Sequence, residues 1–134
     1  MSEQNKQTVR RLMDEFWNKQ NFDVADQMFA PDAVYQTEGV TQSYAEVKAA
    51  FMQTRHAFPD MRVSVDDLLA EGDKVVLRWT ALGTHKNEFI GIAPTNRQVT
   101  MTGLTIYRFS DDRIVQAWNN SDSLGMLRQL GLVP

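Results

Sequence analysis

Cysteine is absent from this sequence, and histidine occurs only twice in 134 residues. Without cysteine the chain can form neither disulfide bonds nor thiolate metal ligands, which favours a reducing compartment such as the cytoplasm. No histidine falls at ligand spacing from the acidic residues between positions 66 and 73, so that patch is typical of solvated surface rather than of a metal site. We therefore expect no bound metal ion.

Other absences narrow the class of protein. The net charge is −3 and Arg10-Arg11 is the main basic cluster, which argues against a nucleic-acid partner. No apolar run approaches the roughly 20 residues of a membrane span. The opening segment MSEQNKQTV lacks the apolar stretch of a signal peptide. We expect one soluble, cytoplasmic domain over residues 1–134, of a size that can bury a core of its own.

Apolar residues at helical spacing predict three helices in the first half of the chain. One apolar face, covering about residues 3–19, is formed by Val9, Leu12, Met13, Phe16 and Trp17. A short helix is expected at residues 23–29, followed by a brief strand in AVYQT. Ser43 and Glu46 have the spacing of a capping box, which predicts the start of a third helix that continues to about residue 57.

The second half of the chain has the pattern of strands. Long alternating segments occupy about residues 61–70, 74–85, 97–109 and 114–119, and short polar turns join them. The tail DSLGMLRQLG returns to helical spacing. Helices followed by a meander predict an α+β domain in which the helices cover one face of a curved antiparallel sheet, with a short helix at the end. A curved sheet leaves a hollow beneath the helices, and small-molecule pockets prefer such places.

Several separated motifs carry a resemblance to a known family. They are VRRLM, APDAVY, GTHKNEFIGIAPTNRQV, YRFSDDRIVQAW and the closing LGMLRQLG, in this order. The chain resembles the SnoaL-like polyketide cyclases, which belong to the nuclear transport factor 2-like superfamily. The resemblance implies a cone-shaped fold of the cystatin-like kind, a pocket for a hydrophobic small molecule and a homodimer. It also implies a reaction without metal or organic cofactor, in which a side-chain acid moves a proton.

The resemblance also shows where this chain departs from the family. The proton-moving carboxylate and its supporting histidine correspond, residue by residue, to Asn119 and Thr105. An amide cannot accept a proton at neutral pH. Two other residues are therefore candidate acids or bases. Asp122 is either a relocated general base or the N-cap of the last helix. His85 is either a pocket residue or a residue that holds the loop around positions 87–94. Asn119 itself is the third catalytic candidate, as an amide that donates a hydrogen bond to an oxyanion or orients a water.

Aromatic residues complete the candidate site. Ligand-binding positions are predicted at Trp17, Trp79, Thr105, Tyr107 and Trp118, although aromatics at strand spacing also serve as plain core. If Ser110 pairs with Arg113 across the SDDR turn, regular alternation places Thr105 opposite Trp118 and sends Asn119 to the other face. The final strand must therefore bulge or end early for Thr105 and Asn119 to share a pocket.

Two functions from different classes follow from these residues. The first is a cyclase or isomerase that acts on a hydrophobic carbonyl or polyketide-like compound by metal-free acid-base chemistry. It requires a titratable group in the pocket, with His85 and Asp122 as the candidates. The second is a binding or dimerisation module of the same fold, which the replacement of the proton-moving pair by Asn119 and Thr105 favours. Fold alone does not choose between them.

Overall fold

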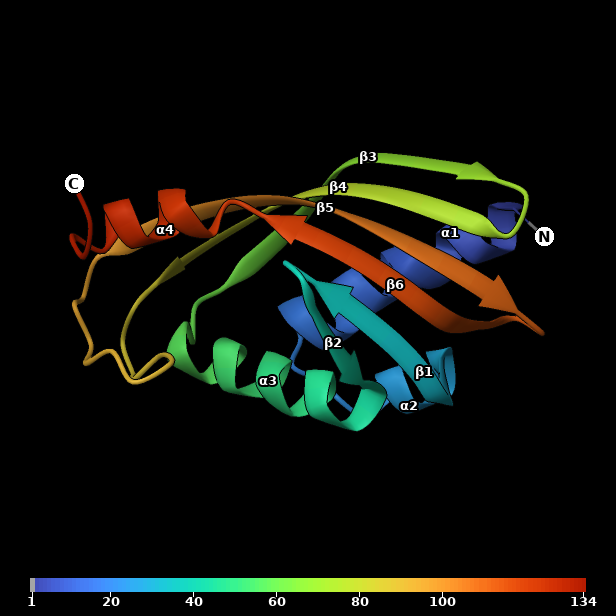
Figure 1. The fold of residues 1–134 in the computed structure, drawn as a ribbon, viewed down its shortest axis with the longest axis horizontal. Helices are drawn as coiled ribbons and strands as arrows, with labels where there is room; N and C mark the ends of the chain where they lie inside the picture. Colours follow the sequence, from blue (N-terminus) through green and yellow to red (C-terminus); the bar gives the residue numbers. More distant parts are fainter. Residues whose placement is uncertain (1) are drawn as a thin grey trace.

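The computed structural model describes residues 2–134, and Figure 1 shows its arrangement of helices and strands. The helices are α1 (Ser2–Arg11), the π-helix η1 (Leu12–Asn18), α2 (Val24–Met28), α3 (Tyr44–Ala57) and α4 (Ser123–Gln129). The three predicted N-terminal helices are therefore confirmed. The capping box is also present: the Glu46 N–H donates to Ser43 Oγ, and the Glu46 carboxylate accepts the Ser43 N–H.

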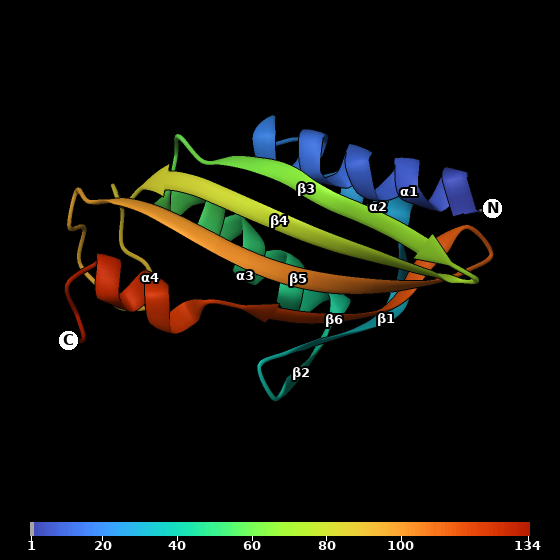
Figure 2. The ribbon, with the colours of Figure 1, turned by 90° about the horizontal axis from the view of Figure 1, so that it is seen from above.

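The strands form one six-stranded sheet. They are β1 (Phe29–Thr37), β2 (Val40–Ser43), β3 (Arg62–Glu71), β4 (Lys74–Thr84), β5 (Gln98–Ser110) and β6 (Arg113–Ser121), in the spatial order β2-β1-β6-β5-β4-β3. Figure 2 shows this order from above. The predicted antiparallel meander is confirmed for β3 to β6. The sheet is not wholly antiparallel, because β1 pairs with β6 in parallel. This pairing is possible because α3 and the long meander separate β1 from β6 in the chain.

A bulge in β6 sets the register on which the site depends. The Asp111-Asp112 turn has two positive φ angles, and Ser110 pairs with Arg113, as the sequence predicts. The register then shifts between Phe109 and Arg108, so that Thr105 lies opposite Asn119 and not Trp118. Because side chains alternate along a strand, this one-residue shift sends Asn119 to the same face as Thr105. The bulge that the sequence analysis required is present.

The helices α1, α2 and α3 cover the concave face of the sheet, and α4 lies at one end of the sheet, as Figures 1 and 2 show together. The larger core cluster joins the N-terminal helices to the inward residues of β1, β4, β5 and β6, among them Val9, Phe16, Leu77, Ile114 and Ala117. The helix η1 has the wider turn of a π-helix, and its residues Leu12, Met13 and Phe16 are buried. Short π-helical segments are found at functional sites in many proteins. None of the helices in residues 2–134 has the length and apolar character needed to cross a lipid bilayer.

Candidate functional site

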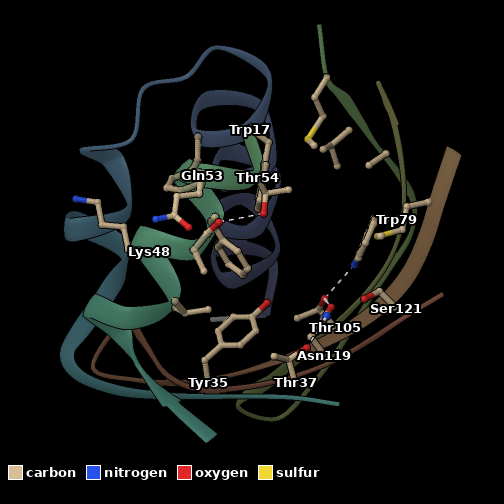
Figure 3. A pocket seen from close by; sticks show the side chains of 18 of the residues that line it. Trp17, Tyr35, Thr37, Lys48, Gln53, Thr54, Trp79, Thr105, Asn119 and Ser121 are labelled. Atoms are coloured by element: carbon tan, nitrogen blue, oxygen red, sulfur yellow. Dashed lines mark hydrogen bonds between the residues drawn. The ribbon is translucent and has the colours of Figure 1, made fainter. Parts of the chain in front are cut away.

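A cavity of about 990 Å³ lies between the helices and the concave face of the sheet. Typical ligand pockets have volumes of roughly 300 to 1,000 Å³, so this cavity can hold a compound of several rings. Its helix side is mainly apolar and includes Leu12, Met13, Phe16, Trp17, Val47 and Phe51. Figure 3 shows Trp17 on this side and Trp79 on the sheet opposite. The polar lining that matters for chemistry is on the sheet.

A chain of hydrogen bonds runs across four neighbouring strands at the sheet side of the cavity (Figure 3). The Trp79 indole N–H donates to Thr105 Oγ1 at 3.0 Å, and the Thr105 hydroxyl donates to Asn119 Oδ1 at 2.7 Å. Asn119 Nδ2 in turn donates to Thr37 Oγ1 at 3.2 Å. This order of donors fixes the orientation of the Asn119 amide. The second N–H of Asn119 and the Thr37 hydroxyl proton are left available as donors.

Two buried tyrosines adjoin this chain. Tyr35 and Tyr107 are 4% and 2% exposed, and the Tyr35 hydroxyl interacts with the side chains of Thr105 and Tyr107. Burial is the main cause that raises the pKa of both phenols well above the ordinary value of 10. Both tyrosines are therefore protonated at neutral pH and can donate hydrogen bonds. Figure 3 shows the Tyr35 hydroxyl directed toward the interior of the cavity.

Gly103 allows Trp79 to lie where it does. The two residues are directly opposite each other on β5 and β4. A Cβ atom at position 103 would lie 2.6 Å from Trp79 Cε2 and 2.9 Å from Cη2, well inside van der Waals contact. The indole therefore occupies the space above the glycine, and its N–H reaches Thr105. A glycine inside a strand often marks such a close approach.

Asp122 is the N-cap of α4 and does not line the cavity. Its Oδ1 accepts the Gly125 N–H at 2.9 Å, and the side chain is directed into the first turn of the helix. Of the two roles that the sequence left open, helix capping fits this position, because the carboxylate satisfies a backbone donor that the helix cannot. A role in proton transfer within the cavity does not fit it.

His85 is completely buried and also lies outside the cavity wall. Its ring packs against Phe58 and Phe89, with centroid distances of 5.5 and 6.4 Å. The Thr95 N–H donates to Nδ1 at 3.2 Å, and the His85 backbone pairs with Asn96 and Arg97. His85 therefore anchors the loop 86–97. Within residues 2–134, Nε2 has no hydrogen-bond partner.

Four of the five predicted ligand-binding residues line the cavity, and the fifth lies on the outer face of the sheet. Trp17, Trp79, Thr105 and Tyr107 line the cavity. Trp118 does not, because the bulge that turns Asn119 inward turns Trp118 outward. On the outer face, Lys74 Nζ lies 6.0 Å from the centroid of the Trp118 ring. The same register shift thus places Asn119 in the site and removes Trp118 from it.

Sequence reasoning missed several lining residues. Tyr35, Thr37 and Glu38 come from β1 and the turn after it, and His56 lies near the end of α3. The alternation of Ala33, Tyr35 and Thr37 is a signal that could have placed Tyr35 and Thr37 on one face. Their neighbours could not have been inferred, because the parallel pairing of β1 with β6 is a long-range contact.

The sheet side of the cavity is therefore suited to binding an oxyanion or a carbonyl oxygen. It presents neutral donors from Tyr35, Thr37 and Asn119, fixed by their neighbours before a ligand arrives. Preorganised donors of this kind stabilise negative charge that develops on oxygen. Within residues 2–134 there is no group of three or more histidine or acidic side chains placed to hold a metal ion.

Solved structures from several bacteria resemble this chain over nearly its whole length. AclR, a proposed hydroxylase from Streptomyces galilaeus, is 29% identical with a TM-score of 0.92, and the match covers 100% of both chains. IdmH, a proposed polyketide cyclase from Streptomyces antibioticus, is 34% identical with a TM-score of 0.84, over 95% of this chain and 98% of the other.

A proposed SnoaL-like polyketide cyclase from Jannaschia sp. CCS1 is 25% identical with a TM-score of 0.89, over 100% of this chain and 96% of the other. A comparison with curated protein sequences finds no match. The model of the SnoaL-like polyketide cyclase family matches residues 7–130. The fold predicted from the resemblance, a nuclear transport factor 2-like α+β domain, is confirmed. This chain belongs to the SnoaL-like polyketide cyclase family.

Proposed function

We propose that the protein is a cyclase or isomerase that acts on a hydrophobic, polyketide-like carbonyl compound held in the cavity, and that it uses neither metal nor organic cofactor. The hydrogen-bond chain from Trp79 through Thr105 and Asn119 to Thr37 carries this proposal. A carbonyl oxygen of the compound accepts hydrogen bonds from Tyr35 and from the free N–H of Asn119. The apolar helix side, with Trp17, packs against the carbon skeleton.

This stabilisation of a carbonyl oxygen differs from the acid-base catalysis by His85 or Asp122 that the sequence predicts. When a proton leaves a carbon beside a carbonyl group, negative charge develops on the carbonyl oxygen, and donors placed there lower the barrier. Loss of one such donor typically reduces the rate by about 10² to 10³-fold. Asn119 in place of a carboxylate supports this role, because a neutral amide donates to an oxyanion while a carboxylate repels it.

A substitution at Thr105 tests the proposed site. Thr105→Val keeps the shape of the side chain but removes the hydroxyl that joins Trp79 to Asn119. We expect this variant to bind the bicyclic aromatic ketone 2-tetralone about fivefold more weakly than the wild type, since one hydrogen bond contributes about 1 kcal/mol. Isothermal titration calorimetry measures the affinity.

Thr102→Val is the matched control, because Thr102 is exposed on the outer face of the same strand. We expect it to bind 2-tetralone as the wild type does. Equal affinity of the Thr105→Val variant would show that the hydrogen-bond chain is not the binding site.

The second candidate function is a binding module without catalysis. One observation favours it: Asn119 Oδ1 and one Nδ2 proton are already engaged by Thr105 and Thr37. Such an amide is well placed to hold a ligand. Exchange of the protons beside the 2-tetralone carbonyl for deuterium, followed by NMR in D₂O, separates the two functions. An enzyme accelerates the exchange, whereas a binder leaves it at the rate in buffer.

We also propose that the protein is a homodimer formed through the outer face of the sheet. The helices leave this face uncovered, and it carries Val76, Leu104, Ile106 and Trp118, with Leu104 51% exposed.

Light scattering after size-exclusion chromatography is expected to give twice the chain mass of 15.3 kDa. Ile106→Lys places a charge in the proposed interface and is expected to give a monomer. A dimer for that variant, or a monomeric wild type, contradicts this interface. Leu132→Lys, near the C-terminus, is the control that stays dimeric.

A further inference from the structure

Glu38 occupies an unusual place in the turn between β1 and β2. Thr37 pairs with Val40, and the two residues between them, Glu38 and Gly39, have φ angles of 51° and 85°. Two positive φ angles define a turn in which asparagine or aspartate followed by glycine is preferred. Glutamate has no short side chain to satisfy this backbone locally. Backbone strain of this kind persists where the surroundings hold the residue in place.

The surroundings of Glu38 are the end of β6 and the start of α4. Glu38 Oε1 accepts the Ser121 hydroxyl at 2.7 Å and the Ser121 N–H at 3.3 Å. The Ser123 hydroxyl lies 2.9 Å from Oε1 and 3.0 Å from Oε2, so that its single proton is shared. The carboxylate is therefore fixed mainly through Oε1. Oε2 keeps an acceptor position that no described residue fills.

Glu38 also lies next to the hydrogen-bond chain at the sheet side of the cavity. It lines the cavity together with Thr37, Asn119 and Ser121. Thr37 is the preceding residue and accepts from Asn119, while Ser121 is two positions beyond Asn119 on the same face of β6. Since a strand rises about 3.3 Å per residue, the carboxylate and the Asn119 amide are separated by roughly two residues along the strand direction. A small conjugated carbonyl group spans that distance.

We propose that Glu38 is the catalytic proton acceptor of this site. The inference rests on the proposed function and adds to it the group that the donor array lacks. By the resemblance, Asn119 stands where the family has its carboxylate, and Glu38, in the turn after β1, supplies a carboxylate instead. Ser121 and Ser123 are positioning residues that aim its free oxygen toward the bound compound.

The proton transfer is balanced without any other reagent. Glu38 Oε2 takes a proton from the carbon beside the carbonyl group, and the C–H bond pair becomes the C=C bond of an enolate. The negative charge moves to the carbonyl oxygen, where Tyr35 and Asn119 donate. In a ring closure the enolate carbon attacks a second carbonyl carbon of the same molecule. The new alkoxide then recovers the proton from Glu38, which returns to the carboxylate.

Other ionisable groups that line the cavity are less well placed. Lys48 Nζ is paired with both carboxylate oxygens of Asp26, at 3.1 and 3.0 Å. Like Glu38, His56 and Glu88 are exposed, but they come from the end of α3 and the loop after β4, neither of which pairs with the strand that carries Asn119. The Glu38 carboxylate accepts hydrogen bonds from Ser121, which lies on the same strand as Asn119.

Deuterium exchange into 2-tetralone, with NMR detection, tests this assignment. Glu38→Gln keeps a carbonyl oxygen that accepts from Ser121 and Ser123, so the fold and the affinity for 2-tetralone are expected to stay within threefold of wild type. The exchange rate is expected to fall by about 10² to 10⁴-fold, the usual contribution of general acid-base catalysis. Glu71→Gln is the matched control, because Glu71 is exposed at the end of β3 and does not line the cavity, and it is expected to keep the wild-type rate.

The outcomes separate this inference from the proposed function. Failure of the wild type to bind 2-tetralone would count against the proposed function itself. Binding by the wild type without accelerated exchange would count against both the proposed enzyme function and the role of Glu38. Accelerated exchange by the wild type, with a Glu38→Gln rate within threefold of it, would overturn the role of Glu38 alone. If Glu38→Gln does not fold, Glu38→Asp provides the test, because the shorter side chain withdraws the carboxylate while keeping its charge. Its rate is then expected to fall at least tenfold, and a wild-type rate would overturn the inference.

Discussion

An Arg55→Met variant is expected to lower the free energy of unfolding by about 3 kcal/mol, because each buried hydrogen bond from a charged group contributes roughly 1.5 to 3 kcal/mol. Arg55 is 3% exposed, and its guanidinium donates to three backbone carbonyl oxygens. Nε reaches Trp17 O at 2.6 Å, and Nη1 reaches Phe58 O at 2.9 Å and Pro59 O at 2.6 Å. Methionine fills the same space and leaves these acceptors without a donor.

The physical basis is that Arg55 joins two segments, the end of η1 and the residues that follow α3. The Trp17 carbonyl belongs to η1, and the Phe58 and Pro59 carbonyls follow α3. Burial lowers the pKa of the Arg55 guanidinium, but arginine remains charged at any ordinary pH. The charge strengthens each of the three hydrogen bonds. We therefore expect η1 to loosen in the variant, and Trp17 with it, so that binding of 2-tetralone also weakens.

Urea unfolding followed by circular dichroism measures the change in stability. Arg62→Met is the matched control, since Arg62 is a nearby arginine that is exposed at the start of β3. It is expected to unfold within about 0.5 kcal/mol of the wild type, as surface substitutions usually do. Arg55→Lys is expected to lie between the two, because an ammonium group lacks the planar fork that reaches all three carbonyls. Equal stability of Arg55→Met and Arg62→Met would contradict the assigned role.

Gly103→Ala is expected to abolish most of the binding of 2-tetralone and to lower the free energy of unfolding by about 2 kcal/mol, within the usual cost of overpacking. The added methyl group would overlap the six-membered ring of Trp79. The indole must then move, and its N–H leaves Thr105. Because Thr105 also donates to Asn119, the whole donor array loses its fixed geometry.

A double-mutant cycle attributes the effect to the contact with Trp79. In the Trp79→Leu background no indole occupies the space above residue 103, so Gly103→Ala is expected to cost less than about 0.5 kcal/mol there. Calorimetry gives the affinities, and thermal unfolding gives the stabilities. A Gly103→Ala effect of the same size in both backgrounds would mean that strand propensity, and not the contact with the indole, is responsible.

The order and type of the main elements could be predicted from local patterns. The apolar spacing from Val9 to Trp17 predicts the first helix because one face must be buried, and the Ser43-Glu46 box marks the start of α3 because its hydrogen bonds are local. The two candidate roles of Asp122 were stated from its position before a helix, and the capping role depends only on the next three residues. Such features need no knowledge of distant contacts.

The sequence by itself determined an α+β domain of the SnoaL-like family. That Asn119 and Thr105 replace the proton-moving pair stays a prediction from the resemblance. The tertiary structure decided which residues meet. The bulge in β6 turned Asn119 inward and Trp118 outward, and the parallel pairing of β1 with β6 brought Thr37 and Glu38 to the cavity. The physical reason differs between the two features. The pairing of β1 with β6 joins segments about 80 residues apart, as the contact from Ser121 to Glu38 illustrates, and the bulge changes the register within the β5–β6 hairpin, which regular alternation does not reveal. Local spacing carries no information about such contacts.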